Sequence, residues 1–217
     1  MRHAIKRVLP SPGPRRFPLG LPRGITMIID FDVHTRTFLG LYEIELSRHL
    51  RRLCPPGTRS FDVGAQVGYD ALILAKLGRG RVVSFEPDPA CLAKMTANFA
   101  LNPDLGHLIT TVAAFVGAGE GTLSLDRYAG SAEGFVPDFV KIDVDGEEAQ
   151  VLEGASGLLA ARRPHLLVEV HSEELERRCG AMLVAHGYRP TIVNQRRVLR
   201  DHRPIPHNRW LVAEGRR

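Results

Sequence analysis

Strands alternate with helices of ten or more residues along most of this chain, and that alternation constrains its fold more than any other feature. Apolar runs at residues 59–63, 81–86, 139–144 and 165–171 predict strands, and each precedes a segment with helical spacing of apolar residues. Consecutive parallel strands need such crossover helices, which cover both faces of the sheet. The sequence therefore predicts a doubly wound α/β protein with a mainly parallel sheet.

Further strands are predicted at residues 107–115 and, as a short one, at 121–125. The last two, at residues 189–193 and 209–213, have no long helix between them, which indicates an antiparallel pair at one edge of the sheet. The helices of this core are predicted at residues 69–77, 89–101, 147–161 and 173–186.

The N-terminal part has a different composition. Residues 1–24 contain five prolines and six basic residues but no acid, which predicts a flexible arm. Residues 26–33 are typical of a strand, with 35–38 as a possible hairpin partner, and a helix is predicted within 41–53. The expected organisation is an arm (1–24) and a single domain (25–217), made of a cap (25–56) and a core (57–217).

Charge and length exclude several classes of protein. The 217-residue chain has a net charge of +5, but its excess of basic over acidic residues lies at the two ends, whereas the middle contains more acidic than basic residues. Such ends leave RNA or an acidic protein open as partners, whereas the lack of interleaved aromatic residues favours solvated arms. No apolar run is long enough for a membrane span, the N-terminus does not resemble a signal peptide, and the three cysteines lack metal-ligand spacing. A cytoplasmic protein is expected.

A glycine-containing turn follows the first core strand, at the place where open α/β sheets bind ligands. Gly64 permits a tight turn, and Gly68 permits close contact at the start of the next helix. A dinucleotide site would need a glycine where Gln66 stands. Asp62, beside the turn, favours a cationic ligand over a pyrophosphate. S-adenosylmethionine, which carries an ammonium and a sulfonium, matches this charge.

Glu86 ends the neighbouring predicted strand, in the sequence FEPDP. A carboxylate at this place can accept hydrogen bonds from both ribose hydroxyls of a nucleoside, and Pro87 restricts the turn that presents it. Glu86 alone could equally cap the next helix, but beside the Asp62 turn the cofactor interpretation is favoured. At the following strand end, small residues such as Ala114 leave room for a flat adenine, although ordinary packing explains them nearly as well.

Polar residues also mark the last two parallel strands. Asp143 lies where a methyl donor and its acceptor would meet, and Glu169 interrupts an apolar strand, where an acid needs a partner. His171 faces the same side and is the candidate general base for an alcohol, with Asp143 or Glu169 orienting the acceptor. These three residues could instead hold a metal, but none is expected. Asp145 is interpreted as a turn former, because the other ligands of a calcium loop are missing.

With these residues identified, the chain resembles the FkbM family of methyltransferases from about residue 40 to residue 213. The resemblance is carried by Gly40, Tyr42 and Glu43, and by the stretches FDVGAQVGYDALILAKLG, VVSFEPDP with NFALN after it, AAFVG with GTLSL, DFVKIDVDGEEAQVLEGA, and LLVEVH. It implies a seven-stranded, Rossmann-like class I methyltransferase fold. It also implies transfer of a methyl group from S-adenosylmethionine, usually to a hydroxyl of a sugar, a polyketide or another small molecule.

Residues and resemblance together predict a site. The expected cofactor-binding residues are Asp62, Gly64, Ala65, Gly68, Glu86, Pro87, Ala114 and Asp143. Between residues 125 and 138 the chain is shorter than is common in the family, which implies a more open mouth or a different substrate. The predicted function is O-methylation of a small molecule or sugar. Methylation of RNA or protein, and a non-catalytic module that binds the cofactor, remain alternatives.

Overall fold

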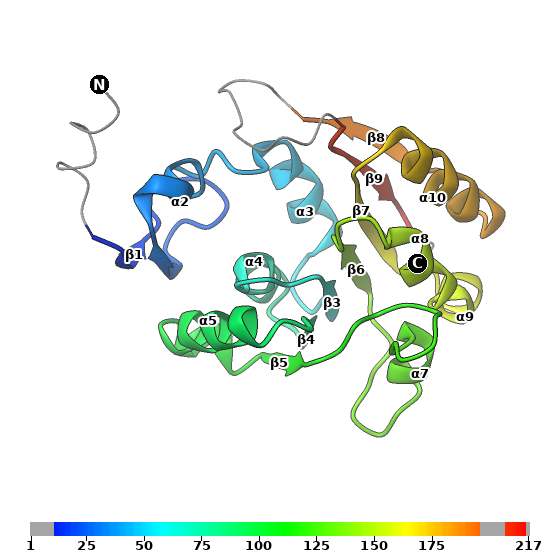
Figure 1. The fold of residues 1–217 in the computed structure, drawn as a ribbon, viewed down its shortest axis with the longest axis horizontal. Coiled ribbons are helices and arrows are strands. Elements are labelled where there is room, and N and C mark those ends of the chain that lie inside the picture. Colours follow the sequence, from blue (N-terminus) through cyan, green and yellow to red (C-terminus); the bar gives the residue numbers. More distant parts are fainter. Residues whose placement is uncertain (1–10, 196–206, 216–217) are drawn as a thin grey trace.

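A seven-stranded sheet forms the centre of the computed structural model, which describes residues 11–195 and 207–215 (Figure 1). In sheet order the strands are β5 (Ile109–Val112), β4 (Val82–Phe85), β3 (Ser60–Val63), β6 (Phe139–Ile142), β7 (His165–Val170), β9 (Arg209–Ala213) and β8 (Thr191–Asn194). The five strands from β5 to β7 are parallel, and β9 is antiparallel to both β7 and β8. The predicted fold class and its antiparallel edge pair are confirmed.

Helices cover both faces of the sheet, as the crossover connections require. One face is covered by α3 (Ser47–Leu53), α4 (Tyr69–Gly78), α5 (Pro89–Ala100) and α6 (Pro103–Gly106). The other is covered by α7 (Leu125–Ala129), α8 (Glu148–Glu153), α9 (Ser156–Ala161) and α10 (Glu173–Ala185). None of the helices in the described ranges combines the length and the apolar composition that a bilayer crossing requires.

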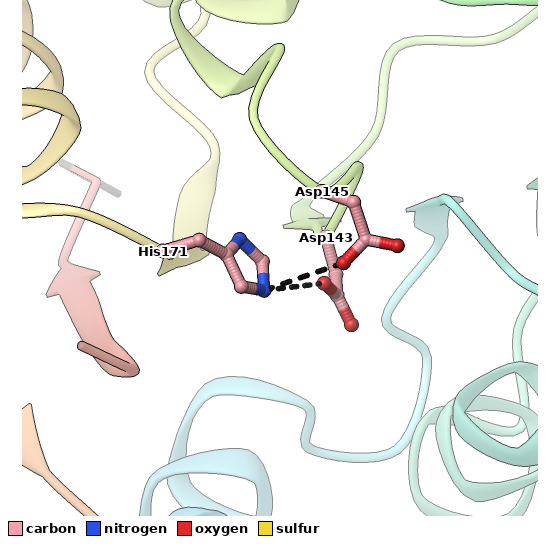
Figure 2. Close-up of side chains that lie close together, drawn as sticks. All are labelled: Asp143, Asp145 and His171. Atoms are coloured by element: carbon pink, nitrogen blue, oxygen red, sulfur yellow. Dashed lines mark ion pairs between the residues drawn. The ribbon is translucent and has the colours of Figure 1, made fainter. Parts of the chain in front are cut away.

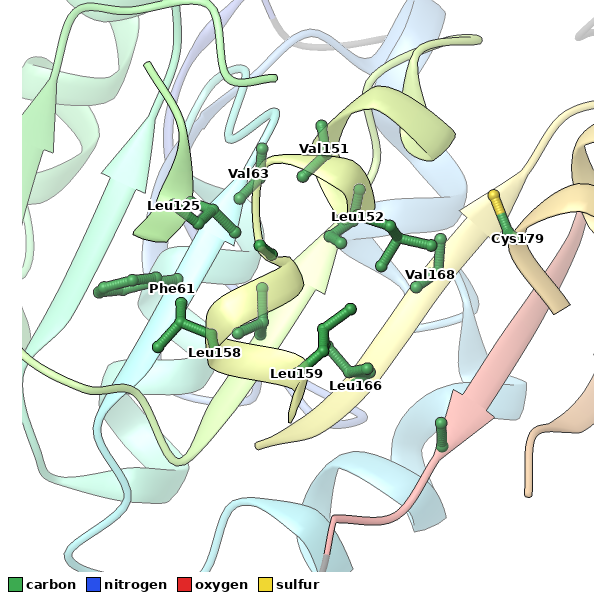
Figure 3. Packing of buried hydrophobic residues seen from close by; sticks show 14 of the residues in the cluster. Phe61, Val63, Leu125, Val151, Leu152, Leu158, Leu159, Leu166, Val168 and Cys179 are labelled. Atoms are coloured by element: carbon green, nitrogen blue, oxygen red, sulfur yellow. The ribbon is translucent and has the colours of Figure 1, made fainter. Parts of the chain in front are cut away.

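Side chains alternate between these two layers along each strand. Phe61 and Val63 of β3 pack into the cluster that α8 and α9 cover (Figure 3). The intervening Asp62 therefore faces the layer of α4, and Lys141 of β6 and Glu169 of β7 alternate in the same way. All three polar side chains are buried. The strand pattern thus places charged groups inside one face of the sheet, near the carboxyl ends of its strands.

The predicted flexible arm is wrong for residues 11–24. The strand β1 (Gly13–Arg16) pairs antiparallel with β2 (Thr26–Ile29), and Phe17, in the connection, is 1% exposed. Asn102 accepts a hydrogen bond from Thr26 N and donates one to Thr26 O, which fastens the hairpin to the end of α5. Buried apolar side chains therefore outweigh the proline content, and the expected boundary at residue 24 falls inside a hairpin. Residues 1–10 of the predicted arm lie outside the described part.

Three local predictions fail where a capping residue or a break decides the structure. The expected hairpin partner at 35–38 belongs to the helix α2 (Phe31–Phe38), because the side chain of Asp30 accepts a hydrogen bond from Asp32 N. The expected strand at 121–125 is replaced by one isolated bridge and by α7, which Ser124 caps. The helix expected at 147–161 is divided into α8 and α9.

The segment at 41–53, expected to be one helix, consists of a short 3₁₀ turn, η1 (Ile44–Leu46), and then α3. Glu43 precedes the turn with a positive φ of 48°, a backbone conformation that side chains rarely adopt. Its main chain therefore departs from the helix that the apolar spacing predicts.

Candidate functional site

The strand order of the sheet reverses between β3 and β6. The chain leaves β3 toward β4 and β5 on one side, whereas β6 and β7 lie on the other side. Open α/β sheets have a crevice at such a point, beyond the carboxyl ends of the strands. Two groups of residues meet there. We call the first, residues 64–68 with Glu86, the Glu86 loop, and the second, Asp143, Asp145, Glu148, Glu169 and His171, the His171 cluster.

Glu86 is held at the end of β4 by backbone amides. Its Oε2 accepts a hydrogen bond from Gln66 N at 2.8 Å, and its Oε1 accepts one from Asp88 N at 2.9 Å. Each carboxylate oxygen retains a lone pair for another donor. The helix-capping role that the sequence left open for Glu86 belongs to Asp88, whose side chain accepts from Ala90 N at the start of α5. The backbone therefore fixes the orientation of the Glu86 carboxylate, and both of its oxygens can still accept a further hydrogen bond.

Two glycines shape the loop, because a side chain fits at neither position. Gly64 has a φ of 81°, and a Cβ added there would lie 1.7 Å from the carbonyl oxygen of Asp143. Gly68 has a φ of 82°, and its Cβ would lie 2.5 Å from Phe99 Cε1. The predicted tight turn is present. Glycine is required because the loop backbone packs closely against the end of β6 and against α5, and not only to leave room for a ligand. The buried Ala65 lies between them and donates its backbone N–H to Phe85 O.

Pro87 and Ala114, two of the expected cofactor-binding residues, line one cavity of about 520 Å³. Tyr128 and Ser131, from the short stretch before β6, line it as well, and the adjoining Phe115 is 69% exposed. The stretch expected to leave an open mouth thus forms part of a cavity wall. Small and flat side chains on this wall suit a planar ring.

A buried lysine pairs with Asp143 of the His171 cluster and with Asp70 of α4. Lys141 is 2% exposed, and its Nζ lies 3.0 Å from Asp70 Oδ2 and 3.2 Å from Asp143 Oδ2. Burial opposes its charge, but the surrounding carboxylates hold the pKa of Lys141 well above its usual value. Burial likewise opposes ionisation of Asp143, yet the nearby Lys141 keeps the pKa of Asp143 below its usual value. This pair is therefore charged.

Asp62 lies deeper than a direct role in ligand contact allows. The side chain is 0% exposed, and neither carboxylate oxygen has a hydrogen-bond donor among the described residues. Burial raises the pKa of Asp62 to about 7, although Lys141 acts in the opposite direction. A cofactor could touch Asp62 only if its neighbours moved, so its effect on a ligand would be electrostatic. The sequence predicted that Asp62 contacts the cofactor directly, whereas the buried side chain could act on a ligand only through its electric field.

Four acidic side chains surround the ring of His171: Asp143, Asp145, Glu148 and Glu169. The Nδ1 atom lies 2.8 Å from Glu148 Oε1, which also accepts a hydrogen bond from Gly146 N. The Nε2 atom lies 3.7 Å from Asp143 Oδ1 and 3.6 Å from Asp145 Oδ1 (Figure 2). The hydrogen bond with Glu148, together with the nearby carboxylates, raises the pKa of His171. The three residues predicted to act together, His171, Asp143 and Glu169, do lie together.

Glu169 completes this cluster from β7. Its Oε2 accepts a hydrogen bond from Trp210 Nε1 at 3.1 Å, whereas Oε1 lies 3.7 Å from His171 Nε2 and has no hydrogen-bond donor in the described part of the chain. The side chain is 0% exposed, and burial raises the pKa of Glu169 to about 7. The partner that the sequence required for this acid is the indole of the last strand.

Sequence reasoning missed five residues in or beside the site: Glu43, Asp70, Lys141, Asp145 and Glu148. A signal for Lys141 existed, because a lysine within an apolar strand must be paired. The resemblance included Glu43 without giving it a role. In the structure its side chain lies near Asp70, Lys141 and Asp143, and its Oε1 has no hydrogen-bond donor among the described residues. Burial raises the pKa of Glu43 well above its usual value.

A comparison with protein families agrees with the expected resemblance. Residues 120–202 match the profile of the methyltransferase FkbM domain. No curated protein sequence matches the chain significantly. The matched segment contains the strands β6 and β7 and therefore the whole His171 cluster.

Solved structures share the fold at low sequence identity. The FkbM methyltransferase from Methylobacillus flagellatus KT has a TM-score of 0.59 and 20% identity, over 72% of this chain and 43% of that one. The precorrin-6y C5,15-methyltransferase from Geobacter metallireducens has a TM-score of 0.55 and 20% identity, over 79% and 85%. Fibrillarin from Aeropyrum pernix, with natively bound S-adenosyl-L-methionine, has a TM-score of 0.52 and 18% identity, over 74% and 68%. The chain spans less than half the length of the FkbM structure.

Proposed function

We propose that the chain is an S-adenosylmethionine-dependent methyltransferase, which its fold and the match of residues 120–202 to the FkbM domain support, and that it methylates a hydroxyl oxygen of a small molecule or sugar. The supporting observation is an excess of acid where the strand order reverses. The ammonium of Lys141 and the imidazole of His171 face seven acidic side chains there: Glu43, Asp62, Asp70, Asp143, Asp145, Glu148 and Glu169. Such a site stabilises a ligand with net positive charge.

The residues present fit this cofactor. Glu86, with a free lone pair on each oriented oxygen, would accept the ribose hydroxyl protons. The partly exposed carboxylates of Asp70 and Asp143 would bind the ammonium, and the buried Asp62 would add to the favourable field. When bound, S-adenosylmethionine supplies a methyl group activated by its positively charged sulfur.

The acceptor would lie beside His171. Glu148 Oε1 already accepts a backbone hydrogen bond from Gly146, so Nδ1 of His171 donates to it and Nε2 keeps its lone pair. That lone pair faces Asp143 and Asp145. Nε2 would take the proton of the acceptor hydroxyl while the hydroxyl oxygen forms its bond to the methyl carbon and the carbon–sulfur bond breaks. Alignment of the two reactants supplies most of the remaining rate enhancement.

The cofactor assignment is tested by Glu86→Gln. The variant loses the charge that accepts the ribose hydroxyls, so we expect the Kd for S-adenosylmethionine to rise roughly 10- to 100-fold by calorimetry. Asp104→Asn, which removes an exposed acid of α6, is the control and should bind as the parent protein does. Equal affinity of Glu86→Gln and the parent would refute the ribose assignment.

The acceptor class is tested by products. The protein is incubated with S-adenosylmethionine and separate pools of sugars, small alcohols, RNA and protein, and the methylated species are identified by mass spectrometry. Methyl groups on hydroxyl oxygens of small molecules are expected. Methylation of RNA or protein alone would replace the proposed acceptor, and cofactor binding without any product would favour a non-catalytic module.

A further inference from the structure

Three ligand-type atoms converge in the His171 cluster. One carboxylate oxygen of Asp143, one of Asp145 and a ring nitrogen of His171 all lie within 4.8 Å of one another (Figure 2). They come from the end of β6, from the turn after it and from the end of β7. Adjacent ligands of an octahedral ion with bonds near 2.1 Å lie about 3 Å apart. Movements of about 1 Å or less for each atom would therefore bring these atoms to coordinating distance.

A fourth atom points into the same place from the buried side. Glu169 is 0% exposed, and its Oε1 has no hydrogen-bond donor among the residues described, yet it lies 3.7 Å from His171 Nε2. The hydrogen bond from Trp210 to Oε2 fixes the carboxylate in this direction. A buried carboxylate oxygen without a partner is costly, and a bound cation would remove that cost.

The ring of His171 is oriented as metal-binding histidines are. Its Nδ1 is held by the buried Glu148, which leaves Nε2 toward the three carboxylates. In metal sites, a carboxylate on the far nitrogen fixes the tautomer and makes the imidazole a better ligand. The same Glu148 oxygen binds Gly146 N, beside Asp145, so one buried acid positions two of the four groups.

We propose that Asp143, Asp145, Glu169 and His171 form a binding site for one divalent cation. Three carboxylates and one imidazole suit an ion of the Mn²⁺ or Mg²⁺ class, which prefers oxygen ligands. This inference changes two expectations from the sequence. No metal was expected, and Asp145 was interpreted only as a turn former. The sequence could not place Asp145 beside His171, because the distance between them depends on the pairing of β6 with β7.

The role of the ion rests on the proposed function, whereas its binding does not. An ion in this place would coordinate the acceptor oxygen and lower the pKa of the hydroxyl. Nε2 would then be a ligand, and the hydroxyl proton would pass to water. The favoured acceptor would carry two neighbouring oxygens, which can bind one ion together.

The experiment measures Mn²⁺ binding to the full chain by calorimetry, after treatment with a chelator and without cofactor. We expect one Mn²⁺ per chain for the parent protein and at least a 10-fold higher Kd for Asp145→Asn. The Asp145 side chain is 74% exposed, so this variant should fold. The matched control is Glu147→Gln, which removes an exposed acid from the same turn without touching His171 and should bind Mn²⁺ normally.

Each result decides the question. The site is refuted if the parent protein shows no saturable Mn²⁺ binding, if Asp145→Asn binds as tightly as the parent, or if Glu147→Gln loses as much affinity as Asp145→Asn. S-adenosylmethionine binding is measured separately, without metal. Cofactor binding without Mn²⁺ binding removes the ion and leaves the methyltransferase proposal, and the reverse result removes the methyltransferase proposal and leaves the ion site.

Discussion

The Glu86 loop and the His171 cluster lie on opposite sides of the same reversal in strand order, but they satisfy their polar groups in different ways. Both oxygens of Glu86 accept backbone hydrogen bonds. In the His171 cluster, Glu169 Oε1 and Glu148 Oε2 have no hydrogen-bond donor among the described residues, although both side chains are fully buried. The carboxylate of Glu86 is therefore held in one orientation by the backbone, whereas the cluster keeps buried acceptor atoms without a donor among the described residues.

Lys141 is the main internal cation on the acidic side, so its removal should have the largest effect. Lys141→Met leaves Asp70 and Asp143 without their buried partner, which should lower the free energy of unfolding by about 3–5 kcal/mol in urea titrations. The control is Arg59→Ala, which breaks an exposed ion pair with Asp138 and should cost about 0–1 kcal/mol. If the two variants lose similar stability, the acidic side does not depend on Lys141.

Gly64 joins the two sides, because its Cα packs against the Asp143 carbonyl. Gly64→Ala should lower the free energy of unfolding by about 2–4 kcal/mol, through overpacking added to left-handed strain. Gly121→Ala separates these causes: Gly121 has a φ of 76°, but a Cβ added there would meet no atom within 4 Å, so strain alone should cost about 1–2 kcal/mol. Equal losses would show that the approach to Asp143 is loose.

The buried Asn98 of α5 links the Glu86 loop to β2, and its removal should lower the stability less than the two changes above. Its Nδ2 donates to Val67 O in the loop, and its Oδ1 accepts from Ile28 N of β2. Asn98→Ala should lower the free energy of unfolding by about 1–3 kcal/mol and weaken cofactor binding while sparing Mn²⁺ binding. Thr96→Ala, on the exposed side of the same helix, should change neither quantity. A loss of Mn²⁺ affinity in Asn98→Ala would show that the two sides are coupled.

The core elements could be predicted because their signals are local. Apolar periodicity predicts the strand at 59–63 and the helix after it. The absence of a long connection predicts the antiparallel edge pair of β8 and β9. The failures depend on contacts beyond the local window. Residues 13–16 form a strand only because β2 lies beside them, and Phe17 is buried by segments distant in the sequence.

The site shows the same limit. The positions of Glu86, Asp143 and His171 at strand ends could be predicted from the end of each apolar run. Their partners could not, because Lys141 meets Asp70 across a sheet and a helix, and Glu148 meets His171 between two elements. The burial of Asp62 could not be predicted either, because the residues that cover it are distant in the sequence.

By itself the sequence determined the α/β alternation and the acids at the carboxyl ends of the strands, because both follow from the spacing of residues along one strand or helix. Only the tertiary structure decided which acids are buried, paired or left without a donor. Those properties depend on the order 5-4-3-6-7-9-8 of the seven strands, which brings Asp62, Lys141 and Glu169 onto one face although about eighty and thirty residues separate them. Burial and electrostatic energy depend on distance in space, and distance in space is set by strand order rather than by sequence separation.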